Sequence, residues 1–160
     1  MLAMPIDNPA DVGELMEFEI RPYVAVGPII FDMTREEVRR RLGAPVESFM
    51  KTPTSAAPAD AFAALGIHVH YNSEERCEAV EFGCQSTNPT FRGRYLLGEP
   101  FAKVEGWLQR IDRDVRSHST GLTSLTFGFG LYAPSALDNP QSPVEGVIVF
   151  RRGYYDQDAL

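Results

Sequence analysis

The stretch GPIIFDMTREEVRRRLGAP, residues 27–45, predicts the end of a strand, a turn and a short helix. Thr34 is a favourable N-cap, and Glu37 stands three residues later, where its carboxylate completes a capping box. Gly43 favours the left-handed conformation that ends a helix, and a proline follows two residues later. The helix is therefore predicted to begin after Thr34 and to end before Gly43.

The side chains of this helix predict what it packs against. Val38 and Leu42 are its only apolar residues, and their i, i+4 spacing places them on one narrow face, which is typical of a helix that lies on a sheet. Arginines at 39–41 complement the negative end of the helix dipole. We interpret them as a solvated helix end rather than as a site for anions or nucleic acid.

The composition and net charge of the chain indicate its size class and the partners it is suited to bind. The chain has 160 residues, of which 44% are hydrophobic, enough for one domain with a core. Its formal net charge of −7 argues against nucleic acid or an anionic membrane as the main partner, and is compatible with a basic protein partner. The first residues do not resemble a signal peptide, and two cysteines suggest reduced thiols, so we expect a cytoplasmic location.

The chain divides into a leader, a domain and a tail. Residues 1–16 are predicted to be a flexible leader and 154–160 a polar tail, which leaves a single domain over 17–153. Within this domain we expect two similar halves, about 18–85 and 90–153, because the order of helix, hairpin and final strand recurs.

Matching positions support the two halves. Val38 and Leu42 correspond to Val104 and Leu108, which lie on one face of a second predicted helix that starts near Pro100. Asp112 and Asp114 follow that helix and are interpreted as solvated turn residues.

Two stretches alternate between apolar and polar residues and predict strands. Over 67–82 we expect an antiparallel hairpin in which Val69 lies opposite Val80 and Ile67 opposite Phe82. The polar face of this hairpin carries His68, His70 and Glu81. A second alternation, over 125–132, predicts one continuous strand. Its polar side carries Thr126 and Tyr132. The fold class is therefore α+β, a tandem repeat of a short helix and an antiparallel sheet, with the helices on one face.

The pattern G-x-x-x-F-x-M-T-x-x-E-V-x-x-x-L-G-x-P in residues 27–45 resembles the repeat of the beta-lactamase-inhibitor-protein-like and SmpA/BamE-like superfamily. The resemblance implies short helices on one face of an antiparallel sheet. For the inhibitor protein, it also implies two tandem modules that bind their target with the open face. The second half departs from the pattern, because Leu97–Pro100 lacks Met-Thr and Gly106 lies within the predicted helix. A looser analogy of architecture connects the chain to small immunity proteins that neutralise bacterial toxins.

Few residues have the spacing of a chemical site. Imidazoles at i and i+2 of a strand point the same way, and a thiolate or carboxylate could join them around zinc. This less favoured metal site would consist of His68, His70, Cys77 and Glu81. The spacing lacks the paired ligands of structural zinc sites, and no nucleophile motif is present, so we expect neither a cofactor nor catalysis.

The sequence therefore predicts a non-catalytic, protein-binding or inhibitory protein, such as an immunity protein that neutralises a bacterial toxin or enzyme. The predicted partner surface is the polar sheet face with His68, His70, Glu81, Thr126 and Tyr132. If that face is not the site, the proline-containing loop 52–60 is the next candidate. Two other functions stay open, a small metal-dependent enzyme that uses His68 and His70, and an envelope-assembly factor, which the apparent lack of an export signal disfavours.

Overall fold

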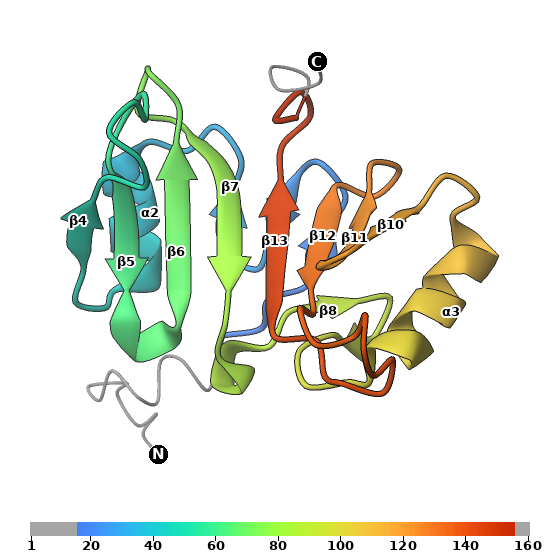
Figure 1. Ribbon diagram of the computed structural model, residues 1–160. Helices are drawn as coiled ribbons and strands as arrows, with labels where there is room; N and C mark the ends of the chain where they lie inside the picture. Colours follow the sequence, from blue (N-terminus) through green and yellow to red (C-terminus); the bar gives the residue numbers. More distant parts are fainter. Residues whose placement is uncertain (1–15, 156–160) are drawn as a thin grey trace.

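The computed structural model describes residues 16–155, and an eight-stranded antiparallel sheet forms its main body (Figure 1). The strand order is β10-β11-β12-β13-β7-β6-β5-β4. One half comprises β4 (Glu47–Phe49), β5 (Ala59–Phe62), β6 (Ile67–Tyr71) and β7 (Cys77–Phe82). The other half comprises β10 (Arg116–His118), β11 (Gly121–Ser124), β12 (Phe129–Tyr132) and β13 (Gly146–Phe150). Pairing of β7 with β13 joins the two halves, and the α+β class is confirmed.

Helices and small sheets complete the fold. Helix α2 (Arg35–Leu42) precedes the first four strands, and α3 (Phe101–Ile111) precedes the second four. A three-stranded sheet contains β1 (Ile20–Arg21), β2 (Ala25–Val26) and β3 (Ile29–Ile30), and a two-stranded one contains β8 (Thr90–Phe91) and β9 (Arg94–Tyr95). Short 3-10 turns, η1 (Ala63–Leu65) and η2 (Gln85–Thr87), flank the β6–β7 hairpin.

The predictions for α2 are confirmed. The Thr34 hydroxyl accepts a hydrogen bond from the Glu37 amide, the Glu37 carboxylate accepts one from the Thr34 amide, and both are 3.2 Å long. Gly43 ends the helix with a φ of 57°, in the left-handed region. Val38 and Leu42 are fully buried, so the apolar stripe of the helix is its contact with the sheet.

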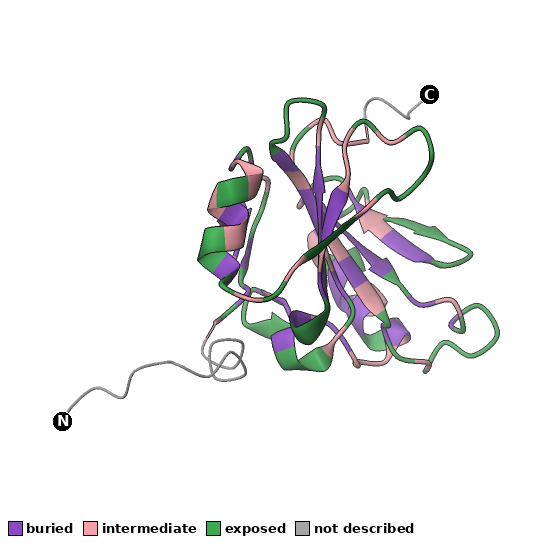
Figure 2. Ribbon diagram, turned by 90° about the vertical axis from the view of Figure 1, so that its left-hand side faces the viewer, coloured by how far each residue is buried: buried purple, intermediate pink, exposed green. Residues whose placement is uncertain are grey.

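Both helices lie on the same side of the main sheet, together with β1–β3, and the other side is open (Figures 1 and 2). Side-chain contacts agree with this arrangement, since Arg39 of α2 bonds Asp60 of β5 and Asp112 at the end of α3 bonds Ser124 of β11. The core fills the space between the layers, where aromatic pairs such as Phe18–Phe82 pack edge to face.

The register of the first hairpin is confirmed as far as His70, but the expected pairing of Asn72 with Cys77 is wrong. Val69 pairs with Val80 and Ile67 with Phe82. The register shifts between His70 and Tyr71, so that Tyr71 pairs with Cys77.

The prediction of one strand over 125–132 is wrong in its first half. Strand β11 ends at Ser124, a turn follows, and β12 begins at Phe129. Gly128 has a φ of 76°, which favours glycine, and its amide donates to the Ser124 carbonyl at 2.9 Å. The alternation of Leu and Phe with Thr and Gly is typical of a strand. Over residues 125–128, however, the hydrogen bonds of a turn determine the backbone conformation.

Two interpretations of charged side chains are corrected by the fold. The Arg39 guanidinium is not a solvated helix end, because it forms bonds of 2.9 and 2.7 Å with the Asp60 carboxylate. Asp112 is not a solvated turn residue, since only 2% of its surface is exposed. Both expectations failed because the partners lie on strands distant in the sequence.

Candidate functional site

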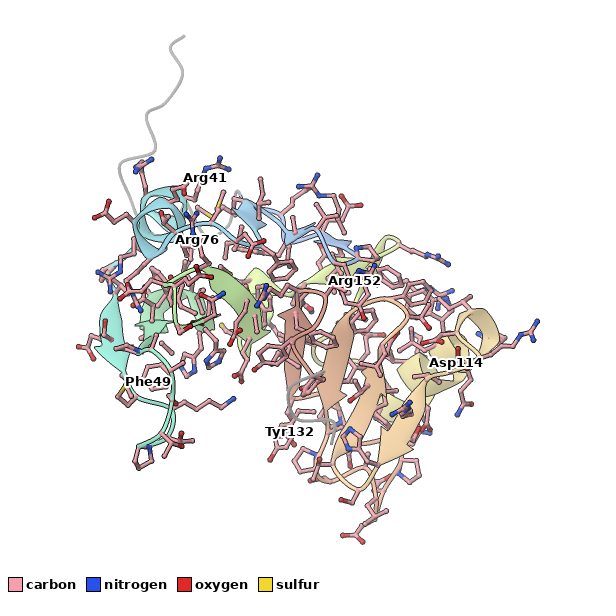
Figure 3. All side chains as sticks on the ribbon, turned by 90° about the horizontal axis from the view of Figure 1, so that it is seen from above. Arg41, Phe49, Arg76, Asp114, Tyr132 and Arg152 are labelled. Carbon is pink, nitrogen blue, oxygen red and sulfur yellow. The ribbon has the colours of Figure 1, made fainter. Side chains whose placement is uncertain are left out.

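The candidate site is the open face, the side of the main sheet away from α2 and α3. Directly paired residues of an antiparallel sheet point to the same side, so the register assigns this face. Its residues include Phe49, His68, His70, Glu81, His118, Thr123, Gly130, Tyr132, Gly146 and Ile148, with the charged Glu47 and Arg116 on the edge strands. Figure 3 shows Phe49 and Tyr132 on this side of the sheet, and Arg41, Arg76 and Arg152 on the other.

A histidine–carboxylate pair lies at the centre of the open face. The Nε2 atom of His70 is 2.5 Å from the Glu81 Oε1 atom, and the Lys51 ammonium lies 3.6 Å from the same oxygen. The bond to His70 lowers the pKa of the Glu81 carboxyl below its ordinary value, against the opposing effect of burial. Glu81 is therefore held as a carboxylate whose negative charge is partly balanced.

The β4 edge of the face is aromatic. The rings of Phe49 and His68 lie tilted against each other, with centroids 4.9 Å apart. His68 is exposed, whereas only 7% of the His70 surface is exposed. All three histidines of the chain, with His118 on β10, lie on the open face.

Two glycines leave the middle of the open face without side chains. Gly130 on β12 and Gly146 on β13 have no side chain where neighbouring strands carry Ile148 and Tyr132. A hollow of about 360 Å³ lies over them, and Glu81, Thr123 and His118 contribute to its walls. A Cβ atom on Gly146 would lie 3.4 Å from the Tyr132 Cβ, so glycine leaves room beside the tyrosine.

The structure brings four of the five predicted partner residues to this face. Thr126 is the exception, because it lies in the turn before β12 and its hydroxyl donates to Asp112 at 2.7 Å. Phe49 was not among the residues predicted for this surface, and no strand was predicted at His118. The sequence does not show which strands β4 and β10 pair with, because each has three residues and lies at an edge of the sheet.

The alternative metal set does not come together. Cys77 is fully buried in the core, and this burial raises the pKa of its thiol. Among residues 16–155, no three His, Cys, Asp or Glu side chains are grouped so that they could hold a metal ion. The His70 ring bonds to Glu81 and to no hydroxyl or thiol within the described part of the chain.

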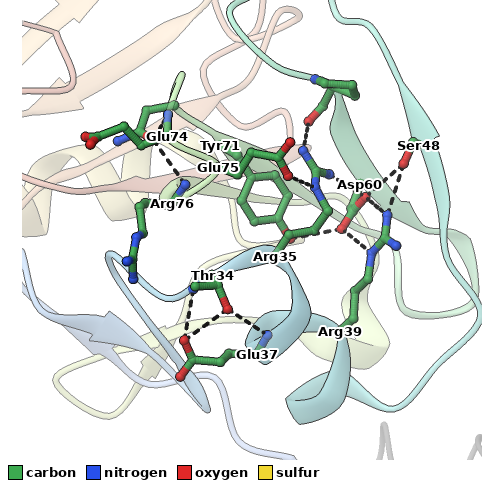
Figure 4. Close-up of polar contacts among 12 residues, drawn as sticks. Thr34, Arg35, Glu37, Arg39, Ser48, Asp60, Tyr71, Glu74, Glu75 and Arg76 are labelled. Atoms are coloured by element: carbon green, nitrogen blue, oxygen red, sulfur yellow. Dashed lines mark hydrogen bonds and ion pairs between the residues drawn. The ribbon is translucent and has the colours of Figure 1, made fainter.

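Beneath the open face, one buried carboxylate fixes α2 to the sheet (Figure 4). Asp60 is fully buried and accepts hydrogen bonds from Arg35, Arg39 and Tyr71 at 2.7–2.9 Å. Burial alone would raise the pKa of the Asp60 carboxyl, but the bonds from Arg39 and Tyr71 and the charge of Arg35 outweigh this effect and lower it. Because Asp60 pairs with Val69, this network aligns β5 with the strand that carries His68 and His70.

A second buried carboxylate supports the other half. Asp112 accepts bonds from the hydroxyls of Ser124 and Thr126 at 2.8 and 2.7 Å, and from the Asp114 amide at 2.9 Å. These contacts connect the end of α3 to the β11–β12 turn. Asp112 therefore fixes the position of the turn that leads into β12, the strand that carries Tyr132.

Comparisons of the chain with protein-family models, with characterised proteins and with solved structures found no match. None of the helices within residues 16–155 has the length and apolar character needed to cross a membrane.

Proposed function

We propose that this chain is a non-catalytic protein that binds another protein through its open face, as an inhibitor or an immunity protein does. One observation carries the proposal: helices and small sheets cover one side of the eight-stranded sheet, while the other side presents ordered but exposed side chains. Tyr132 is 52% exposed, and Phe49 and His68 form a second aromatic group across the face. Aromatic side chains on a rigid surface bind at low entropic cost.

The order of elements supports the further proposal that the domain is a duplicated unit. Each helix is followed by four sequential antiparallel strands, and the two sets meet at β7 and β13. The matched residues Val38, Leu42, Val104 and Leu108 all pack in the core. Such a duplication would create one long sheet with a continuous open face.

Photo-crosslinking in extracts of the native host tests the proposed surface. A benzophenone amino acid replaces Phe49 or Tyr132 on the open face, or Val24 or Tyr95 as exposed controls elsewhere. We expect one protein to crosslink from the two open-face positions and not from the controls. Crosslinks from the controls alone would contradict the proposal.

The captured protein is then purified and its binding to the intact chain is measured. Tyr132→Ala should weaken the complex about tenfold or more, with a melting temperature close to that of the wild type. Glu81→Lys should weaken it as well, but it should also lower the melting temperature, because it removes the partner of the buried His70 and places a second ammonium beside Lys51. If both variants bind normally and substitutions in residues 52–58 abolish binding, the loop is the site and the open-face proposal is wrong.

A further inference from the structure

The chain repeatedly covers its own aromatic rings with arginines. Arg35 lies 4.1 Å over the Tyr71 ring while its guanidinium also pairs with Asp60 at 2.9 Å. Three further examples are Arg92 over Phe127, Arg94 over Trp107 and Arg152 over Tyr23, at 4.9, 4.3 and 4.1 Å. The first case combines an aromatic face with a carboxylate, which is a favourable environment for a guanidinium.

Tyr132 on the open face and Glu145, directly before β13, provide the same two groups around one hollow without a cation. Glu145 directly precedes β13, and its amide donates to the Tyr132 carbonyl at 2.8 Å, beside the register pair of Tyr132 and Gly146. Glu145 is exposed, and within residues 16–155 no basic group pairs with its carboxylate or lies over the Tyr132 ring.

Both side chains line a hollow of about 420 Å³ at one end of the open face. His68, Glu81 and Gly83 also line it, and neither lysine nor arginine does. Lys51 contacts Glu81 from the adjoining hollow and balances that carboxylate only. The Glu145 carboxylate is thus the uncompensated charge of this hollow.

We propose that this hollow receives an arginine side chain from a loop of the protein partner, an inference that rests on the proposed function. The guanidinium would stack on Tyr132 and form an ion pair with Glu145, as Arg35 does with Tyr71 and Asp60 inside the chain. Arginine suits the hollow better than lysine, because its planar cation stacks on a ring and binds a carboxylate with two hydrogen bonds. The aliphatic stem would lie along Gly83 and Gly146, which also line this hollow.

A short peptide probe tests the site without the natural partner. Acetyl-Gly-Arg-Gly-amide is titrated into the intact protein while amide chemical shifts are recorded, and lysine and citrulline peptides are compared. We expect saturating shifts around Tyr132, Glu145 and Gly146, with the arginine peptide about threefold tighter than the lysine peptide or better. The citrulline peptide has a similar shape but no charge, and it should not saturate.

Matched variants separate this site from general attraction of a cation. Glu145→Gln and Tyr132→Leu should each weaken the arginine peptide about threefold or more, whereas Glu74→Gln and Tyr95→Leu, exposed residues outside the hollow, should leave it unchanged. Equal binding of arginine and citrulline peptides, or equal effects of both pairs of variants, would overturn the inference.

The outcome for the hollow is distinct from the outcome for the proposed function. If open-face crosslinking captures a partner but the arginine peptide does not bind, the partner uses the face without the predicted arginine. If the peptide binds at the hollow but no partner crosslinks to the open face, the function is wrong although the hollow accepts a guanidinium. Gly83→Phe is a further variant for the peptide titration. A Cβ atom at this position meets no atom within 4 Å, and the new ring would obstruct the hollow, so the arginine peptide should bind more weakly.

Discussion

Replacing Asp60 by asparagine should destabilise the domain strongly, because this carboxylate is the meeting point of α2 and the sheet. It is fully buried and receives charged hydrogen bonds from Arg35 and Arg39. Breaking a buried ion pair on one side costs about 3–5 kcal/mol. The lower end applies, since 13% of the Arg35 side chain and 38% of the Arg39 side chain are exposed and can regain water. We expect a loss of about 3 kcal/mol, a large share of the stability of an ordinary domain.

Urea denaturation measures this loss, and a matched variant controls for removal of charge. Arg41→Gln changes an exposed arginine of the same helix, whose guanidinium donates a 3.2 Å hydrogen bond to the Pro28 carbonyl. It should cost less than about 0.5 kcal/mol. Arg39→Gln should cost about 1.5 kcal/mol because Arg35 stays bound, and the double variant with Asp60→Asn should show strong coupling. A loss below about 1 kcal/mol for Asp60→Asn would refute the argument.

Acid titration provides a second test of the same carboxylate. The pKa of Asp60 is lower in the folded state, so its contribution is present above the unfolded pKa, about 3.9, and is lost as the pH falls through the folded pKa. The wild type should therefore lose more stability than Asp60→Asn between about pH 5 and pH 2. Parallel acid profiles would show that Asp60 is not the linked group.

Burial and contacts predict the effects of four further substitutions. Thr34→Ala should cost about 1 kcal/mol through loss of the capping box, and Val38→Ala about 2 kcal/mol through loss of packing, both measured by urea melts. Asp112→Ala should cost about 2 kcal/mol in the same assay, because two hydroxyls lose their acceptor. Tyr132→Ala should change stability by less than about 0.5 kcal/mol, since 52% of the side chain is exposed, and a larger loss would mean that the ring supports the fold.

Local signals in the sequence were sufficient for α2 and for the first hairpin. The capping box and the final glycine act within one helix, and the alternation over 67–82 determines its own register. Strands β5, β10 and β11 gave no such signal, because they are three or four residues long and rich in Ala, Ser, Gly or Arg. They form because neighbouring strands provide partners, which a local pattern does not contain.

The same distinction applies to the candidate site. His68, His70 and Glu81 were placed together because they belong to one hairpin, and Tyr132 reached the same face because β12 keeps the expected alternation. The grouping of Phe49 with His68 depends on β4 pairing with β5. Thr126 was misplaced because its preference for the buried Asp112 carboxylate cannot be read from the strand pattern.

The acidic residues of the chain are divided unevenly between the terminal segments and residues 16–155. Five of the 22 acidic residues lie at 1–15 and 156–160, so residues 16–155 hold 17 acidic residues against all 15 lysines and arginines. Asp60 and Asp112 are buried, and Asp60 is balanced by arginines, so neither adds much to an exposed field. Under the proposed function, long-range attraction to a basic partner would therefore depend largely on the terminal segments and on ionic strength. The open face would then select its partner through shape and local contacts rather than through net charge.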